Sequence, residues 1–460
     1  YNCLGIIHGE MGFEGRAIDC YRKAISINRN FADAYTNLAV LLTRMGELDK
    51  ALDSAQKAVS LNPKSPKTHN NLGIIYNRIG RYDDAVASFR TAIRIDPNNA
   101  ESYNNMGNVY SNMGDLEQAL LCHEEAISIN PYNPGARNNI SLIQLLKGNF
   151  SDGWKNFEGR FVSAENLLLK KFPGFSAPQW NGEDLANKRI LIWGEQGVGD
   201  EVLFTSMVPD QIRAGADIVL QSDKRLKPLL ARSFPSVTCI TTEEFGYDEN
   251  NVLKYDYHSP LGHMGNWLRP DQNSFPDRAS YLVADSDHRN QCRDRYLDFG
   301  NDTIVGISWS SKGPDYGEGK SMSLPDLRPV LEIPGVTFVD LQYGDTGDER
   351  AAFQKETGIE IVHDDCVDQL ANLDDFASQV AAMDYVVTIS NTTAHFAGAL
   401  GIPSMVMLGY APLWYWQLER DDCLWYPMSR LFRQAEMGDW SGVVSQTAEA
   451  LAQNLLKAKS

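Results

Sequence analysis

The sequence lacks the long apolar runs, paired cysteines and basic excess that mark several common classes of protein. No run approaches the roughly 18 apolar residues of a membrane span, so we expect no insertion into a bilayer. The seven cysteines are scattered and form no CxxC pair, which disfavours a disulfide framework and a zinc site and suits a reducing cytoplasm. Acidic residues outnumber basic ones by 60 to 42, so nucleic acids and anionic membranes are poor partners.

A repeat of 34 residues occupies the first third of the chain. Glycines recur at that spacing: Gly12, Gly46, Gly80, Gly114 and Gly148. Alanines and prolines recur in the same frame, and the pattern resembles the tetratricopeptide repeat, a pair of antiparallel helices. We therefore expect an all-α solenoid over residues 1–161, truncated at its start because Tyr1 matches an interior position of a repeat. Trp154 and Phe157 break the pattern of the fifth repeat, where we expect the joint to the next domain.

Four asparagines share one position of the repeat: Asn37, Asn71, Asn105 and Asn139. Residues at one such position line the concave surface of a solenoid, and a carboxamide can pair with the amide groups of an extended peptide. The spacing resembles the asparagine ladder of O-GlcNAc transferase, which implies that a protein acceptor binds here. The alternative is that asparagine is simply common at this position of the repeat.

Strand and helix patterns alternate through the rest of the chain. Continuous apolar runs predict buried parallel strands joined by helical crossovers, and hence two doubly wound, Rossmann-like halves. The clearest predicted elements are strands at Arg189–Trp193, Thr303–Ser308, Tyr385–Ile389 and Pro403–Leu408 and a helix at Thr392–Leu400. We expect a linker at 162–187, halves at 188–300 and 301–442, and a closing helix at 443–460 that braces the first half.

Polar residues gather where these strands end, which is where parallel sheets bind ligands. A glycine-rich turn lets a backbone approach a ligand, and a lysine together with a helix N-terminus suits a diphosphate. The candidate donor-site residues are Gly197, Gly199, Ser310, Lys312, Gln342, Asn391, Thr392, Thr393 and His395, with Lys320 as a further contributor. Helix capping is the alternative role for the residues of the Asn391 turn, and packing is the alternative for His395.

Several segments of the chain resemble known glycosyltransferases. They are Gly199-Asp200 before an apolar helix, the block 390–401, and the later segments 425–427, 430–434 and 438–440. The families are the ADP-heptose:lipopolysaccharide heptosyltransferases and the bacterial proteins that join repeats to such a domain. The resemblance implies a GT-B fold, a nucleotide-sugar co-substrate, and inverting glycosyl transfer without metal or cofactor. It also implies that Asp200 is the general base, with Glu195 and Glu201 as alternatives.

The turn Asn391-Thr392-Thr393 is also similar to the donor-diphosphate loop of O-GlcNAc transferase. Ser390, however, stands where many heptosyltransferase-like sequences carry Asp, which puts heptose in doubt as the sugar. Because a repeat array suits a protein acceptor, we expect cytoplasmic protein O-glycosylation, with a flagellin-like acceptor as one candidate.

Three other functions remain open. One is a heptosyltransferase-like enzyme acting on lipopolysaccharide, and another is a non-catalytic assembly or adaptor protein with a degenerate domain. The third is a dehydrogenase in which Asp223 binds a ribose. The pair Asp285 and Asp287 has a spacing that can bind a divalent metal, but we expect it to cap a helix that follows.

Overall fold

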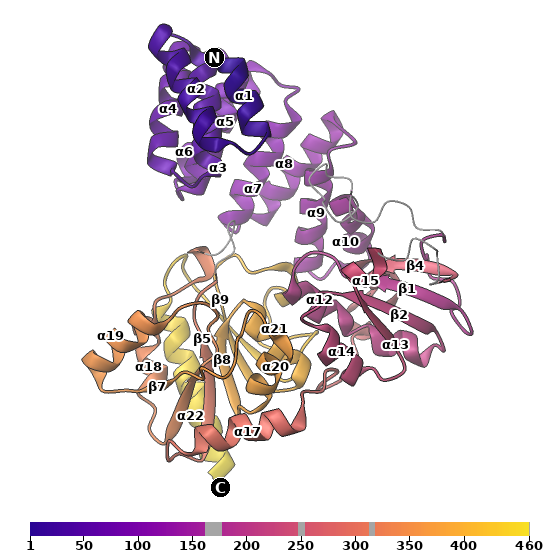
Figure 1. Ribbon diagram of the computed structural model, residues 1–460. Helices are drawn as coiled ribbons and strands as arrows, with labels where there is room; N and C mark the ends of the chain where they lie inside the picture. Colours follow the sequence, from indigo (N-terminus) through magenta and orange to yellow (C-terminus); the bar gives the residue numbers. More distant parts are fainter. Residues whose placement is uncertain (162–176, 247–253, 312–317, 460) are drawn as a thin grey trace. The chain divides into compact units, whose positions relative to one another are not determined.

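The computed structural model describes residues 1–161, 177–246, 254–311 and 318–459, and it divides into two compact units (Figure 1). One unit is Tyr1–Ile143 with Gly159–Ser163, and the other is Gln144–Glu158 with Ala164–Ser460. Most of the predicted linker and the candidate Lys312 lie outside the described residues.

The first unit is the predicted array of helix pairs. Its helices are α1 (Asn2–Glu10), α2 (Glu14–Ile27), α3 (Ala32–Arg44), α4 (Leu48–Leu61), α5 (Pro66–Arg78), α6 (Tyr82–Ile95), α7 (Ala100–Asn112), α8 (Leu116–Ile129) and the greater part of α9 (Pro134–Leu146). The five glycines of the repeat all have φ between 75° and 78°, a left-handed conformation that favours glycine. The turn position therefore explains why glycine recurs there.

A second repeated position explains how the helices of a pair pack closely. A Cβ on Gly73 would lie 2.7 Å from the ring of Phe89, and a Cβ on Gly107 would lie 2.6 Å from the ring of His123. Each ring thus fills the space that the glycine leaves open.

The second unit contains two parallel sheets. The first sheet has the order β3-β2-β1-β4, with Ile190 paired to Ile218 in its centre. Its strands are β1 (Arg189–Trp193), β2 (Asp217–Ser222), β3 (Thr238–Thr241) and β4 (Tyr257–Pro260). The helices that follow its strands are α12 (Val198–Thr205), α13 (Val208–Arg213), α14 (Lys227–Ser233) and α15 (Thr242–Gly246).

The second sheet has the order β10-β9-β8-β5-β6-β7 and is parallel throughout its described strands. Its strands are β5 (Thr303–Ser308), β6 (Val336–Asp340), β7 (Ile361–Val362), β8 (Tyr385–Ile389), β9 (Ser404–Leu408) and β10 (Ser429–Arg433). The strand order reverses between β5 and β8, which makes their carboxyl ends the expected place for a ligand.

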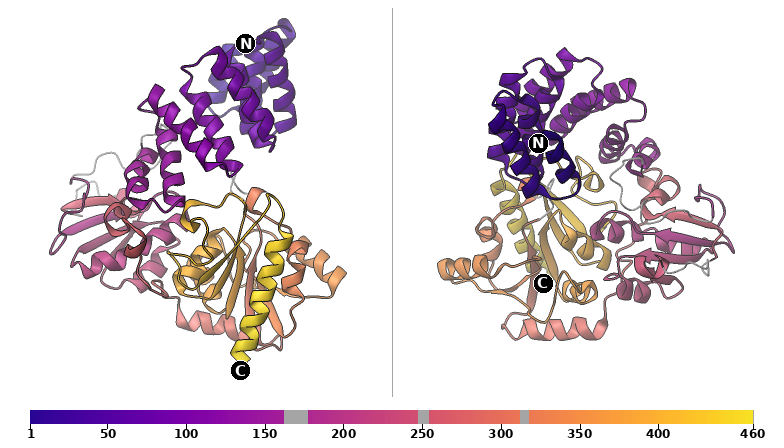
Figure 2. Two further views of the ribbon diagram at one scale, coloured as in Figure 1. Left: turned by 180° about the vertical axis from the view of Figure 1, so that it is seen from behind. Right: turned by 45° about the horizontal axis from the view of Figure 1, so that its top comes forward.

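Helices cover both faces of the second sheet (Figures 1 and 2). They are α17 (Ser286–Leu297), α18 (Arg328–Leu331), α19 (Gly347–Thr357), α20 (Leu373–Ala381), α21 (Thr392–Leu400) and α22 (Ser441–Lys459). The expectation that the last helix braces the first half is wrong. Val444 and Leu451 of α22 are buried in one core with Val305 and Met405, because the apolar side of this helix completes the second sheet's own core.

The departure of the fifth repeat from its pattern has a structural reason. Helix α10 (Phe150–Phe157) belongs to the second unit, where Trp154 makes edge contacts with Phe204 and Trp414 at centroid distances of 6.4 Å and 5.5 Å. Trp154 also donates a hydrogen bond from its indole nitrogen to the carbonyl of Arg269 at 2.8 Å. Aromatic residues therefore replace the usual small residues, because this helix packs with the α/β unit.

None of the described helices combines the length and the apolar character that a membrane span needs. The seven cysteines all lie in the described part of the chain, and each is a free thiol.

Candidate active site

Asp200 lies in the first turn of α12, directly after the glycine-rich turn that leaves β1. Its carboxylate accepts a hydrogen bond from the backbone N–H of Gly197, the N-cap residue of α12, at 3.3 Å, so it helps to cap its own helix. The side chain is nevertheless partly exposed, and it lies close enough to Lys320 for their charges to interact. Burial lowers the pKa of the Lys320 ammonium, and the Asp200 carboxylate acts in the opposite direction.

His395 comes from α21 in the second half and meets the same turn. A Cβ on Gly199 would stand 3.0 Å from its Cδ2 atom. Its ring stacks on Trp416 and contacts the edge of Tyr415. Burial, with a smaller effect of the Lys320 charge, lowers the pKa of His395 to about 3, so the imidazole is neutral.

Three buried polar side chains connect the carboxyl ends of β5, β6 and β8. Ser308 donates its hydroxyl to Oε1 of Gln342 at 3.0 Å, and the same oxygen accepts the backbone N–H of Ser310 at 2.8 Å. Asn391 donates from Nδ2 to the Ser308 hydroxyl at 2.6 Å and to the Ser310 carbonyl at 3.3 Å. This network holds the loop after β5 in place, and the side chains of Gln342 and Asn391 are engaged within the protein.

The N-terminus of α21 is likewise partly occupied by the protein's own groups. Asn391 caps it by accepting the N–H groups of Thr393 and Ala394, at 3.0 Å and 3.4 Å. Thr393 is fully buried and donates its hydroxyl to the carbonyl of Leu341 at 3.2 Å, whereas Thr392 is partly exposed. Donor binding at this turn stays a prediction, and Thr392 is the side chain of the turn best placed for it.

Two carboxylates named as alternatives to Asp200 are buried inside the first half. Glu195 is 1% exposed and accepts the N–H of Gly262 at 2.8 Å. Glu201 accepts the N–H of Asp223 at 2.9 Å, and burial raises its pKa to about 7. Neither carboxylate is as exposed as Asp200, so Asp200 is the most accessible of the three.

Two further acidic positions have structural partners. Both carboxylate oxygens of Asp223 accept hydrogen bonds from the guanidinium of Arg225, at 2.9 Å and 2.8 Å. The Asp223 carboxylate, which was considered as a ligand for a ribose, is therefore engaged with the protein itself. Asp285 caps α17 by accepting the N–H groups of Asp287 and His288, which confirms the capping interpretation. Among the described residues, no three His, Cys, Asp or Glu side chains group in a way that could hold a metal ion.

The asparagines of the repeat unit form a ladder between successive repeats. Asn37 donates from Nδ2 to Asn2 at 3.1 Å, Asn105 to Asn70 at 3.1 Å, and Asn139 to Asn104 at 3.2 Å. Three of the four predicted peptide-binding amides therefore stabilise the stack, and their role in binding a peptide stays a prediction.

Asn71 breaks this ladder. Its Nδ2 atom is buried and finds no acceptor among the described residues. The position that would accept from it in the preceding repeat is occupied by Thr36, whose hydroxyl instead donates to the carbonyl of Ala32 at 2.9 Å.

Sequence reasoning gave no role to the aromatic residues around His395, although Tyr426 lies in the segment 425–427 that carries the resemblance to glycosyltransferases. Tyr426 is fully buried and its hydroxyl lies 2.8 Å from Nδ1 of His395, and Trp416 donates to the hydroxyl of Ser390 at 2.8 Å. The three consecutive aromatic residues 414–416, just after a buried strand, were the signal that could have found them.

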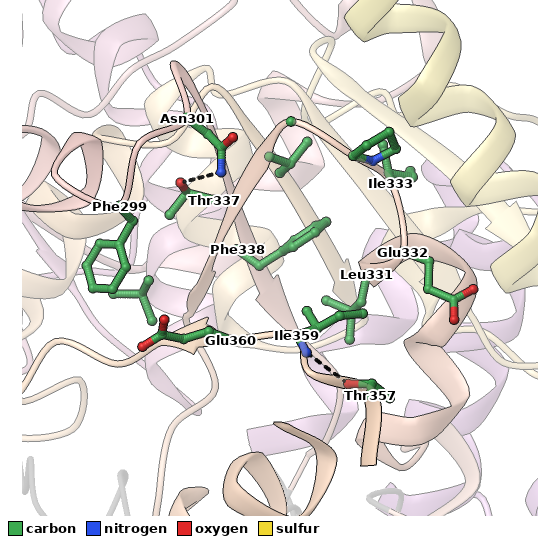
Figure 3. A pocket seen from close by; sticks show the side chains of 14 residues that line it. Phe299, Asn301, Leu331, Glu332, Ile333, Thr337, Phe338, Thr357, Ile359 and Glu360 are labelled. Atoms are coloured by element: carbon green, nitrogen blue, oxygen red, sulfur yellow. Dashed lines mark hydrogen bonds between the residues drawn. The ribbon is translucent and has the colours of Figure 1, made fainter. Parts of the chain in front are cut away.

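The pocket in Figure 3 is separate from the candidate active site. It is lined by residues at the amino ends of the strands, such as Val336 and Thr337 of β6 and Ile359 ahead of β7. The Nδ2 atom of Asn301 donates to the Thr337 hydroxyl there at 3.4 Å. Because parallel sheets bind ligands at the opposite edge, we do not assign the candidate active site to this pocket.

Comparison with known families identifies the first unit. Residues 32–65, 54–87 and 100–133 match the family described as tetratricopeptide repeat, and residues 75–114 match one described as TPR repeat. The N-terminal region is thus an array of tetratricopeptide repeats, and the predicted class of its fold is confirmed.

A relative of the chain is Protein FlbA of Caulobacter vibrioides, which is homologous to it over part of its length. The two are 35% identical over 324 residues, which is 67% of this chain and 53% of FlbA. That alignment is about twice as long as the 161-residue repeat region, so the similarity extends into the α/β unit. The chain spans about half the length of this curated relative.

Two solved structures are similar to part of the chain. MamA is 26% identical, with 35% of this chain and 94% of that chain covered and a TM-score of 0.31. PilF of Pseudomonas aeruginosa is 22% identical, with 38% and 91% covered and a TM-score of 0.32. Each covers little more than a third of this chain.

Proposed function

We propose that the protein is a glycosyltransferase that moves a sugar from a nucleotide sugar to a hydroxyl group of a protein bound by the repeats. The proposal rests on one observation. Asp200, in the first half, lies close to Lys320 of the second half, and the neighbouring Gly199 packs against His395 of the second half. Two parallel sheets that contribute groups to one place support the proposal of a GT-B enzyme.

The charges of these groups suit an inverting transfer. Asp200 takes the proton of the acceptor hydroxyl as the oxygen attacks the anomeric carbon. The departing nucleotide gains negative charge, which the Lys320 ammonium and the N-terminus of α21 stabilise. No metal ion is needed in this scheme, because the leaving group is neutralised by these protein groups.

Two properties support Asp200 rather than its neighbours as the base. Its side chain is partly exposed, whereas Glu195 and Glu201 are buried and hydrogen-bonded to backbone amides. It belongs to the half opposite Lys320 and α21, the groups proposed to stabilise the departing nucleotide, which is where an acceptor would approach. His395 remains neutral, so it is suited to accept a hydrogen bond rather than to supply charge.

The acceptor follows from the repeats. Tetratricopeptide arrays bind protein partners on an extended surface, so a protein acceptor, with a flagellin-like protein as one candidate, fits better than lipopolysaccharide. The competing function is a repeat adaptor without catalysis, and the family matches over residues 32–133 are equally compatible with it.

Nucleotide binding separates the two functions. We expect one member of a panel of nucleoside monophosphates and diphosphates to bind in calorimetry, and Lys320→Ala to weaken that binding about tenfold, equivalent to about 1.4 kcal/mol. Lys227→Ala is the matched control, because this lysine pairs with Glu244 on the surface of the first half. If no nucleotide binds, the adaptor function is favoured.

A further inference from the structure

Helix α10 contacts both halves of the α/β unit through one buried side chain, Trp154. Its indole nitrogen donates to the carbonyl of Arg269 in the first half, and a Cβ on Gly265 of that half would lie 2.6 Å from its ring. On the second half, its ring makes edge contacts with Trp414 and Trp425 at centroid distances of 5.5 Å and 6.5 Å. Trp154 is 0% exposed, so the indole is enclosed by groups from both halves.

In the first half, Trp154 touches the helix that carries Asp200. The centroid of its ring lies 6.4 Å from that of Phe204. Phe204 is four residues after Asp200 on α12, so the two side chains share one side of the helix. Because a short helix moves as a rigid element, a displacement of Phe204 also displaces Asp200.

In the second half, Trp154 touches the segment that packs on His395. Trp414 is followed by Tyr415 and Trp416 in a single 3-10 turn. The ring of Tyr415 contacts the edge of the imidazole at 4.9 Å, and Trp416 stacks on it at 5.9 Å. Trp154 is therefore in direct contact with the element that carries Asp200 and with the segment that holds His395.

We infer that Trp154 is a positioning residue of the transferase, whose indole sets the separation between the helix that carries Asp200 and the segment that packs on His395. A close-packed ring of this size cannot be removed or tilted without a shift of its neighbours, and the bond to Arg269 fixes its orientation. The inference rests on the proposed function. It also extends the catalytic region to α10, although this helix lies within the predicted repeat region 1–161.

Hydrogen exchange tests the contact with both halves and needs no activity. In Trp154→Ala we expect several-fold faster exchange of backbone amides both in α12 and in residues 414–416. Trp180→Ala is the matched control, because this tryptophan is also buried, packs on Trp267 of the first half and donates to the carbonyl of Glu183. Its effect should not reach residues 414–416. Faster exchange in only one of the two segments of Trp154→Ala, or in neither, would overturn the inference, as would the same pattern in Trp180→Ala.

Gly265→Ala serves as the second variant in case Trp154→Ala does not fold. The new Cβ displaces the indole and leaves every aromatic ring of the contact in place. The same two segments should exchange faster than in the unaltered protein, by a smaller factor than in Trp154→Ala. Unchanged exchange in residues 414–416 of Gly265→Ala would contradict the inference.

Kinetics test the consequence for transfer. Because the groups proposed to hold the donor lie in the second half, Trp154→Ala should leave the affinity for a nucleotide sugar unchanged and lower kcat per folded protein about tenfold or more. Trp154→Phe keeps an aromatic ring and should recover most of this loss, whereas Trp180→Ala should keep kcat per folded protein unchanged. If the unaltered protein binds no nucleotide sugar, the proposed function itself fails, and hydrogen exchange still decides whether Trp154 joins the halves. If it releases nucleotide and kcat is unchanged in Trp154→Ala, only the present inference fails.

Discussion

Gly199 lies so close to the imidazole of His395 that a Cβ on the glycine would be 3.0 Å from Cδ2 and 3.4 Å from Nε2. The two residues belong to helices α12 and α21, one from each half of the α/β unit. The imidazole cannot easily withdraw, because it is stacked on Trp416 and hydrogen-bonded to Tyr426. The close approach of the halves at this point thus depends on a residue without a side chain.

Gly199→Ala should destabilise the α/β unit. Overpacking costs about 1–3 kcal/mol, and the better helix propensity of alanine returns up to about 1 kcal/mol, so we expect a net loss of about 1–2 kcal/mol in denaturant unfolding. Gly197→Ala is the control, because its Cβ would make an ordinary contact, 3.7 Å from Asp200. A Gly199→Ala protein as stable as the control would contradict the close packing.

Asn391→Asp should separate the two functions of this side chain. Aspartate can still cap α21, but it cannot donate to Ser308 and it would face the carbonyl of Ser310. We expect a loss of about 1–3 kcal/mol in the free energy of unfolding, the cost of unsatisfied buried groups. Asn99→Asp at the N-terminus of α7, where the side chain only accepts from Ser102, should change stability by no more than about 0.5 kcal/mol. Equal effects of the two substitutions would show that the network is unimportant.

Thr36→Asn should stabilise the repeat unit. The new carboxamide would give Asn71 the acceptor that the neighbouring rungs already have, and asparagine fits this frame position at Asn70 and Asn104. We expect a gain of about 0.5–1.5 kcal/mol in the free energy of unfolding, the net value of one hydrogen bond. The reciprocal change Asn70→Thr should lower stability, because it removes the acceptor of Asn105. A loss of stability in Thr36→Asn would show that the missing hydrogen-bond acceptor of Asn71 does not limit the stability of the repeat unit.

His123 should make the repeat unit sensitive to acid. Burial lowers its pKa from 6.5 to about 4, so the folded state binds the proton less tightly than the unfolded state. The stabilisation is complete above pH 6.5 and is lost as the pH falls toward 4, by an amount on the order of 2–3 kcal/mol.

His123→Phe should remove this dependence, since Phe89 fills the same position in the preceding repeat. Hydrogen exchange of α7 and α8 at pH 7.5 and pH 5 reports on this unit separately from the buried histidines of the α/β unit. Equal acid sensitivity in the unaltered protein and in His123→Phe would show that His123 is not the cause.

The sequence predicted the elements whose pattern is local. The strands β1, β5 and β8 and the helix α21 have the predicted bounds. Each strand is a continuous apolar run that ends at polar residues, and the helix has small and apolar residues at helical spacing. The repeat was predicted for the same reason, since glycine and alanine recur at positions fixed by helix contacts.

The partners of the polar residues could not be predicted in this way. Ser308 forms hydrogen bonds with Gln342 and Asn391 because its strand, β5, lies between β6 and β8. No local sequence pattern encodes this order of the strands. The hydrogen-bonded asparagines of the ladder are 35 residues apart, one residue more than the length of the repeat. This offset appears only when the helices are stacked. Residues chosen as ligands for a substrate therefore turned out to be engaged with the protein itself.

The most direct test of the central claim is release of nucleotide from nucleotide sugars by the unaltered protein and by Asp200→Asn, with Glu201→Gln as a control at a buried carboxylate. We predict release from at least one donor, a fall of about 100-fold or more in kcat for Asp200→Asn, and unchanged nucleotide affinity. No release with any donor, or equal rates for the unaltered protein and Asp200→Asn, would contradict the account.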